Sequence, residues 1–180
     1  MMNLWRDLPV GKHPPDEVTA VIEIPTGSRN KYELDKATGL MKLDRVLYSA
    51  VHYPGDYGFI PRTLHEDNDP LDVLVLVKEM TFPGCMMDVR PIGVLKLLDR
   101  GEPDDKILGV PCHDPYYNEI FDIADIPSHS LKEIEHFFLT YKDLEGKRMQ
   151  AMGWGKSDEA MRIVLESMKR YDDAYLTVGP

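Results

Sequence analysis

The sequence predicts an α+β fold in which a core of short strands is followed by helices. Apolar runs rich in β-branched residues recur at short spacing between residues 18 and 111, with turn residues between them. The last third of the chain instead places apolar residues at the period of an amphipathic helix. Strands that precede the helices, rather than alternate with them, are typical of α+β proteins. This periodicity leaves open whether the sheet closes on itself.

Composition limits the protein classes to which the chain can belong. Its 180 residues predict a single domain over 1–180, and 43% apolar and 29% charged residues are ordinary for a globular protein. A formal net charge of -10 argues against a nucleic-acid partner, which would need a basic face. The N-terminus lacks the apolar core of a signal peptide, and the apolar runs are shorter than the roughly 20 residues of a membrane helix. With only Cys85 and Cys112 as thiols, these features predict a cytoplasmic protein without a membrane partner.

The first strands are expected soon after an irregular lead-in over 1–17. An apolar run over 18–25 predicts a strand, and a turn separates it from a second, shorter strand over 31–35. Glu23 interrupts the first run, so its carboxylate faces either solvent or a polar site. Because burying an unpaired charge is costly, we favour the solvated face for Glu23.

The next stretch gathers carboxylates at the mouth of a strand. Asp67 and Asp69 lie in a turn that contains Asn and Pro, and Asp72 enters an apolar strand expected over 71–77. Three such carboxylates repel one another unless a cation holds them, and Mg²⁺ takes one or two carboxylates together with water or phosphate oxygens. The alternative is a solvated acidic turn. An EF-hand is excluded, because its twelfth position counted from Asp67 would be Lys78 rather than Glu.

A tightly turned aromatic segment, 53–58, precedes this acidic turn. It places the phenols of Tyr53 and Tyr57 four residues apart around two glycines. They are either core aromatics beside a turn or hydroxyl donors aimed at an anion.

A second group of carboxylates follows two further strands, expected over 89–98 and 107–111. The charged turn between them contains Asp99, Asp104 and Lys106. A solvated hairpin tip is the ordinary explanation of such a turn, although it repeats the arrangement of carboxylates at the start of a core strand.

Helices are expected in the last third. Ser130 and Glu133 form a capping box, and the helix that they begin has a stripe at i, i+3, i+4 and i+7 and ends near Gly146. A second helix starts at 157, after a short edge strand over 149–154, and a loose tail is expected over 171–180. The expected buried stripes are Ile134, Phe137, Phe138 and Tyr141 in the first helix and Met161, Val164, Leu165 and Met168 in the second.

The acidic turn resembles the signature of the family I soluble inorganic pyrophosphatases, in the residues Asp67-Asn68-Asp69-Pro70-Leu71-Asp72-Val73. The segment 53–58 resembles the stretch that precedes this signature, and further segments agree in order between about residues 18 and 154. This resemblance implies a small closed barrel of the OB-like type with two C-terminal helices packed outside. It also implies hydrolysis of pyrophosphate, several Mg²⁺ ions per site and, as in bacterial-type enzymes, a homohexamer.

The resemblance also implies roles for individual residues. Asp69 would accept the proton of the attacking water, while Arg100 departs from the acidic residue that many members carry beside Asp99. The implied metal ligands are Asp67, Asp72, Asp99 and Asp104. The implied substrate ligands are Lys31, Arg45, Tyr57, Lys106, Tyr141 and Lys142, with Glu23, Glu33 and Tyr53 as further site residues.

Two other functions are weighed against this one. A metal-dependent hydrolase of nucleotides or of another phosphoanhydride would use the same carboxylates, and only its P-loop version is excluded, because the chain has no Walker A sequence. An OB-like module that binds oligonucleotides is disfavoured by the net charge and by the lack of a continuous basic stripe.

Overall fold

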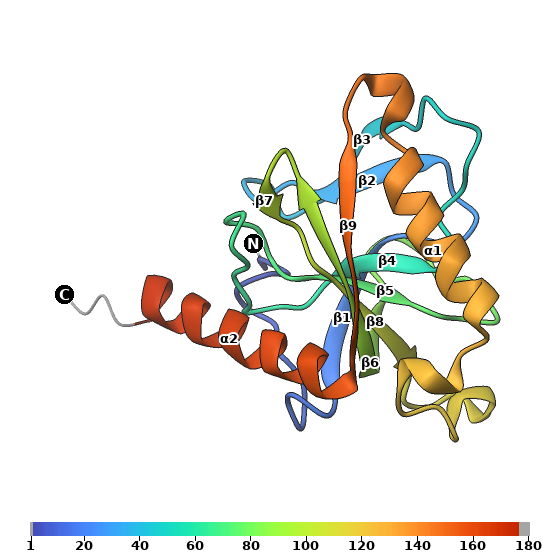
Figure 1. Ribbon diagram of the computed structural model, residues 1–180. Helices are drawn as coiled ribbons and strands as arrows, with labels where there is room; N and C mark the ends of the chain where they lie inside the picture. Colours follow the sequence, from blue (N-terminus) through green and yellow to red (C-terminus); the bar gives the residue numbers. More distant parts are fainter. Residues whose placement is uncertain (1, 177–180) are drawn as a thin grey trace.

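The computed structural model describes residues 2–176 and shows a curved sheet with two helices on its outside (Figure 1). The lead-in is irregular as expected. The strands are β1 (Val18–Ile24), β2 (Asn30–Leu34), β3 (Met41–Val46), β4 (Asp56–Phe59), β5 (Asp72–Val75), β6 (Met86–Asp99), β7 (Glu102–Pro103), β8 (Lys106–Pro111) and β9 (Met149–Lys156). The helices are α1 (Ser128–Thr140) and α2 (Ser157–Tyr175), with 3-10 turns η1 (Pro115–Tyr117), η2 (Ile123–Asp125) and η3 (Asp143–Glu145).

The main sheet closes into a ring. Its strands follow the order β1, β4, β5, β8 and β6, and β6 pairs again with β1. The pairing of β5 with β8 is parallel, and the other pairings of the ring are antiparallel. β2 and β3 form a separate hairpin, while β9 extends the sheet along β6. The expected α+β fold with a small closed, OB-like barrel is therefore confirmed.

Each long helix covers a different part of the barrel. Phe137 and Phe138 of α1 pack into a cluster with Leu95 and Leu108, whereas Val164 of α2 belongs to a second cluster with core strands. The helices thus bury their apolar faces against the strands, as expected for two C-terminal helices packed outside. No helix among residues 2–176 is long and apolar enough to cross a membrane.

Two strands that the sequence analysis did not predict have opposite surroundings. β4 is buried along its whole length, in a segment that we had expected to be turned. Gly58 within it is required by close packing, since a Cβ there would lie 1.9 Å from the carbonyl oxygen of Val21. β3 is largely exposed, and its apolar alternation extends only from Met41 to Asp44 before Arg45 interrupts it. It forms only because it pairs with β2.

Asp56 fixes the start of β4 from a fully buried position. Its carboxylate accepts hydrogen bonds from the backbone N–H and the hydroxyl of both Thr26 and Thr81, at 2.6–3.0 Å. A buried carboxylate needs such donors, because its charge is costly without them. Asp56 therefore ties two turns to the strand that carries Tyr57.

The expected start of the first helix is wrong by three residues, because the N-cap is Pro127 and not Ser130. α1 begins at Ser128 after Pro127, which has no side-chain cap, so Ser130 lies inside the first turn. A capping box is instead formed by Asp122 and Asp125 at η2. α1 also ends earlier than expected, and Gly146, with φ of 71°, caps η3 instead.

The second helix starts at residue 157 as expected but presents a different face to the core. Leu165 is 48% exposed, and Met161 and Met168 are only partly buried. The buried positions are Ala160, Ile163, Val164, Ser167 and Tyr171. The loose tail was wrong for 171–175, which continue α2, and its last residues, 177–180, lie outside the described part of the chain. The edge strand β9 is confirmed and extends to Lys156.

Candidate active site

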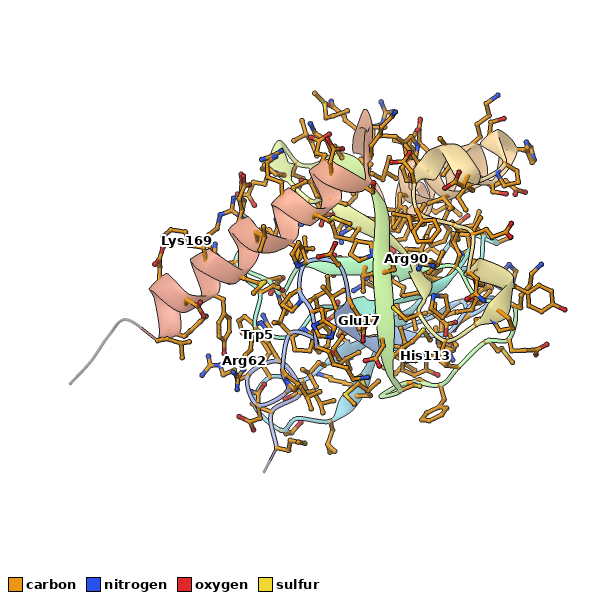
Figure 2. All side chains as sticks on the ribbon, turned by 90° about the horizontal axis from the view of Figure 1, so that it is seen from below. Trp5, Glu17, Arg62, Arg90, His113 and Lys169 are labelled. Carbon is orange, nitrogen blue, oxygen red and sulfur yellow. The ribbon has the colours of Figure 1, made fainter. Side chains whose placement is uncertain are left out.

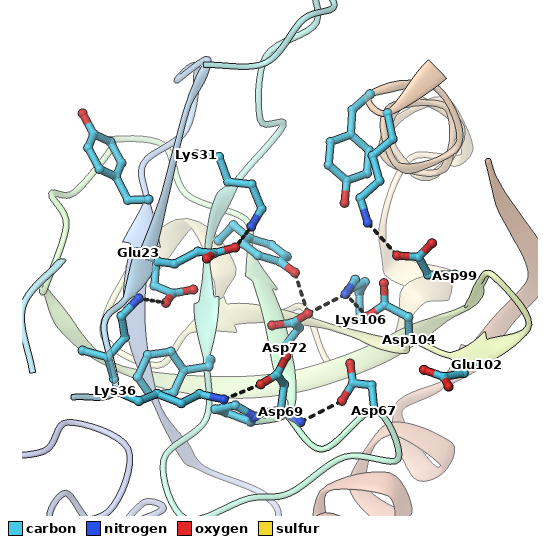
Figure 3. Close-up of a pocket in the computed structure, with 18 of the residues that line it drawn as sticks. Glu23, Lys31, Lys36, Asp67, Asp69, Asp72, Asp99, Glu102, Asp104 and Lys106 are labelled. Atoms are coloured by element: carbon cyan, nitrogen blue, oxygen red, sulfur yellow. Dashed lines mark hydrogen bonds and ion pairs between the residues drawn. The ribbon is translucent and has the colours of Figure 1, made fainter. Parts of the chain in front are cut away.

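An open cleft of about 910 Å³ lies beside the mouth of the barrel (Figure 3). Its walls come from β2, the loop before β5, the turn between β6 and β8, and the segment after α1. All the candidate site residues except Arg45 and Tyr53 line this cleft. The fold thus brings together residues that are more than a hundred positions apart in the chain.

Asp72 occupies the centre of the polar network. It is the first residue of β5, between β4 and β8, so two neighbouring strands supply its partners. The hydroxyl of Tyr57 donates to Asp72 Oδ2 at 2.6 Å, and the ammonium of Lys106 donates to the same oxygen and to Asp104. The sheet register thus explains why a tyrosine and a lysine from separate motifs meet at one carboxylate.

Lys106 is buried, with a side chain that is only 4% exposed. Burial alone would lower the pKa of this ammonium, but the carboxylates of Asp72 and Asp104 raise it further than burial lowers it. The pKa of Tyr57 is also raised, first by burial and then by the charge of Asp72. Lys106 therefore stays charged and Tyr57 stays a hydroxyl donor at neutral pH.

Asp99 stands on the opposite wall, at the end of β6. Lys142 donates to its Oδ2 at 2.9 Å, while its Oδ1 is buried and has no hydrogen-bond partner. Burial raises the pKa of Asp99, but Lys142 and Arg100 lower it by more, so Asp99 is ionised. Arg100, which departs from the family pattern, is the rim residue that faces Asp99 at 3.6 Å.

The expectation that Glu23 is solvated was wrong. Its carboxylate lines the cleft and accepts a hydrogen bond from the backbone N–H of Leu34 at 2.6 Å. Burial is the main cause that raises the pKa of Glu23 to about 8, and the negative charges of Asp72 and Glu33 also raise it. The hydrogen bond from Leu34 N–H and the positive charge of Lys31 lower it by less. The β2 strand next to it presents Lys31 and Glu33 on one face, where they form an ion pair.

Two candidates lie outside the lining of the cleft. Arg45 pairs in register with Lys31, and its guanidinium binds Glu145 at 2.8 Å and Asp44 at 2.5 Å. Tyr53 is buried, with its ring 4.7 Å from that of Phe137. Of the two alternatives for the phenols, Tyr53 fits the core aromatic and Tyr57 the hydroxyl donor.

The cleft also contains charged residues that the sequence analysis missed. Lys36, in the turn after β2, forms an ion pair with Asp69 Oδ1 (Figure 3). Glu102, in β7, lines the cleft beside Asp104. Lys36 follows Glu33 by three residues at the end of a strand, and that position was the only signal in the sequence for it.

The carboxylates suit a hard divalent cation in their chemistry. Oδ1 of Asp99 is buried and has no hydrogen-bond partner, and burial raises the pKa of Asp67, as do the charges of Asp72 and Asp104. Among residues 2–176, however, no three His, Cys, Asp or Glu side chains converge closely enough to hold an ion alone. The donor set therefore fits a cation that keeps other positions for water or phosphate oxygens.

Comparisons with known proteins show which family this chain resembles. The family described as inorganic pyrophosphatase matches residues 20–172. The inorganic pyrophosphatase of Haloferax volcanii is 49% identical over 97% of this chain and 99% of its own length. That of Geobacillus stearothermophilus is 52% identical over 87% of this chain and 94% of its own length. The crystal structure of inorganic pyrophosphatase from Thermus thermophilus superposes with a TM-score of 0.92 at 46% identity, and covers 95% of this chain and 99% of that one.

Proposed function

This chain belongs to the inorganic pyrophosphatase family and hydrolyses pyrophosphate to two phosphates, and we propose that the acidic cleft is the active site of this reaction. The observation that carries the proposal is the alternation of charges in the cleft. Three lysines of the cleft each form an ion pair with a carboxylate: Lys31, Lys106 and Lys142. One cavity therefore contains ammonium groups that can bind a polyanion and carboxylates that can bind metal ions.

The basic groups and phenols would bind the substrate. Lys31, Lys106 and Lys142 offer ammonium groups from three walls, and the hydroxyls of Tyr57 and Tyr141 add donors. Arg45 would join them from the edge, since its planar guanidinium suits two phosphoryl oxygens. Phosphoryl transfer depends mainly on such positioning and charge stabilisation.

The family implies a divalent metal cofactor, and Mg²⁺ is the ion that we propose here. Asp67, Asp72, Asp99 and Asp104 would hold it, several ions to a site. When bound, Mg²⁺ neutralises phosphate charge and lowers the pKa of water. Of the two glutamates that border these carboxylates, Glu33 would add to the negative field that attracts the ions, whereas Glu23, with a pKa raised to about 8, is mostly protonated at neutral pH.

Asp69 would act on the attacking water. It is the most exposed of Asp67, Asp69 and Asp72, with a side chain that is 62% exposed, so water can reach its carboxylate. Its backbone is fixed, because its N–H donates to Asp67 Oδ1 at 3.0 Å and its carbonyl accepts from His65 N–H at 2.8 Å. A fixed backbone with a reachable carboxylate is the arrangement that a general base requires.

Phosphate release from pyrophosphate and from ATP, with Mg²⁺, with Ca²⁺ and with EDTA, tests this function. We expect turnover of pyrophosphate with Mg²⁺, little with Ca²⁺ and none in EDTA, because Ca²⁺ prefers more ligands at longer distances. Faster hydrolysis of ATP than of pyrophosphate would favour the nucleotide hydrolase instead. Undiminished activity in EDTA would contradict the metal assignment.

We also propose that residues 1–180 act as one domain, assemble as a homohexamer and work in the cytoplasm. The resemblance to bacterial-type enzymes supports the hexamer. The single domain is supported by the closed ring of strands and by the packing of both long helices against it. Light scattering coupled to size-exclusion chromatography would measure the mass of the assembly, for which one chain contributes 20.6 kDa.

A further inference from the structure

The ammonium of Lys36 lies between two groups from distant parts of the chain. It forms an ion pair with Asp69 Oδ1 and lies 5.0 Å from the centre of the Trp5 ring. Lys36 follows β2, Asp69 precedes β5, and Trp5 belongs to the N-terminal segment. Figure 3 shows that the Lys36 side chain extends toward Asp69. The N-terminal segment therefore contacts the site through this lysine.

Trp5 is a rigid support for that ammonium. Its side chain is buried, and its indole N–H donates to the carbonyl oxygen of Thr63 at 2.8 Å. The rings of Tyr171 and Tyr175 contact it edge-on, at 5.9 and 5.6 Å between ring centres. Figure 2 shows Trp5 beside the C-terminal part of α2. An ammonium within about 6 Å of a ring centre is attracted to the face of the ring.

The Asp69 side chain needs such a support if it is to act on water. Both partners of the ion pair are largely exposed, at 48% for Lys36 and 62% for Asp69. A pair between two free surface side chains contributes little, because ordering both costs entropy. Here the Trp5 ring restricts Lys36 in advance, so less freedom is lost when the ammonium holds Asp69.

We propose that Lys36 is a positioning residue, which holds Oδ1 of Asp69 and so leaves Oδ2 directed at the attacking water. The inference rests on the proposed role of Asp69 as general base. Catalysis is sensitive to such placement, since a misplacement of about 1 Å can cost as much as 10²-fold in rate. Lys36 thus differs from Lys31, Lys106 and Lys142, which we place on the phosphates.

Steady-state kinetics of Lys36→Met and Lys36→Arg test this role. We expect Lys36→Met to lower kcat about 10-fold with KM changed less than about twofold, because the carboxylate is misplaced while the phosphate ligands remain. Lys36→Arg should restore most of the turnover, since a guanidinium also pairs with a carboxylate and stacks on indole. Lys132→Met, on the exposed face of α1, is the matched control and should behave like the parent protein. A raised KM with unchanged kcat would make Lys36 a phosphate ligand and overturn the proposal, and so would unchanged kinetics.

The same change made in an Asp69→Asn background separates this inference from the proposed function. Lys36→Met should then cause no further loss, because it acts only through Asp69. A second loss of similar size would show that Lys36 acts elsewhere and would overturn the proposal. Normal turnover of Asp69→Asn would instead contradict the assignment of Asp69 as general base. The kinetics of Lys36→Met alone could not give that result.

Fluorescence gives a readout that does not depend on turnover. The chain has two tryptophans, so Trp154→Phe leaves Trp5 as the reporter. In that background we expect Lys36→Met to change the emission of Trp5, while Lys132→Met does not. Unchanged emission would show that Lys36 does not rest on the ring and would refute the support that we assign to Trp5.

Discussion

Asp69→Asn and Asp72→Asn each remove one negative charge, from positions three residues apart, yet the structure predicts different consequences. Asparagine at position 69 keeps the size of the side chain and still accepts from Lys36, but it cannot take up a proton. Loss of a general base usually costs about 10²- to 10⁴-fold in rate. Such a loss corresponds to about 2.7–5.5 kcal/mol of transition-state stabilisation. Because Asp69 is largely exposed, the free energy of unfolding should change little.

Asp72→Asn changes a buried network in addition to a proposed metal ligand. Asp72 Oδ2 accepts from both Tyr57 and Lys106, and Lys106 is almost fully buried. Breaking one buried ion pair costs about 3–5 kcal/mol, and the remaining pair with Asp104 offsets part of that cost. We therefore expect lower stability without metal and weaker binding of Mg²⁺, with activity that excess Mg²⁺ partly restores.

The assay is a Mg²⁺ titration of pyrophosphate hydrolysis, repeated across pH, for both variants. Asp69→Asn should reach its low plateau at the same Mg²⁺ concentration as the parent, and higher pH should partly restore it, since hydroxide then needs no base. Urea unfolding in EDTA checks that only Asp72→Asn is destabilised. If excess Mg²⁺ rescues Asp69→Asn as fully as Asp72→Asn, Asp69 is a further metal ligand and the reasoning is refuted.

Three other changes test separate parts of the structure. Arg45→Lys should lower kcat/KM by about 10- to 100-fold, the value of one charge-assisted hydrogen bond, with little loss of stability, and normal turnover would remove Arg45 from the site. Asp56→Asn should lower the free energy of unfolding by about 1–3 kcal/mol in urea melts, because only the oxygen of its amide can accept, so the N–H of either Thr26 or Thr81 loses its acceptor; an unchanged melt would show that the turn relaxes. Glu23→Gln concerns a carboxyl whose pKa burial raises to about 8 from an ordinary 4.5, so the metal-free parent should lose stability as pH rises between these values. The glutamine cannot ionise, and urea melts in EDTA at pH 5 and pH 8 should therefore show a smaller difference for the variant than for the parent.

The sequence was sufficient to predict those strands and helices whose burial produces a recognisable pattern of apolar residues. The apolar runs of β1, β5, β6 and β8 and the start of α2 were predicted because burial selects their residues directly. β3 was missed because pairing with β2, and not burial, makes it a strand. The start of α1 was misplaced because Ser130 and Glu133 match a capping pattern, whereas the helix begins at Ser128, after Pro127 and without a side-chain cap. A helix boundary depends on the chain that approaches it, which a local pattern does not describe.

The members of the cleft were predictable as motifs, whereas their partners were not. Asp67, Asp72 and Asp104 could be recognised from their turns, but only the sheet register shows that Lys106 lies between the last two. Glu23 was assigned to solvent because burial of a charge is costly, although the Leu34 N–H eleven residues away offsets part of that cost. Such compensation comes from tertiary contacts, and no pattern within a single strand indicates it.

The pairing of charges in the cleft explains how a chain with a net charge of -10 can bind a polyanion. In the absence of substrate, Lys31, Lys106 and Lys142 form ion pairs with carboxylates of the cleft, so the charges of the lysines and of these carboxylates offset each other. A phosphate that binds these lysines would leave their carboxylates without a positive partner, and these carboxylates would then attract metal cations. Metal cations bound to the carboxylates would, in the same way, leave the lysines available for phosphate. Each ligand therefore improves the site for the other, and this coupling is reciprocal by thermodynamic necessity. We therefore expect the acidic cleft to bind pyrophosphate more tightly in the presence of divalent cations than in their absence.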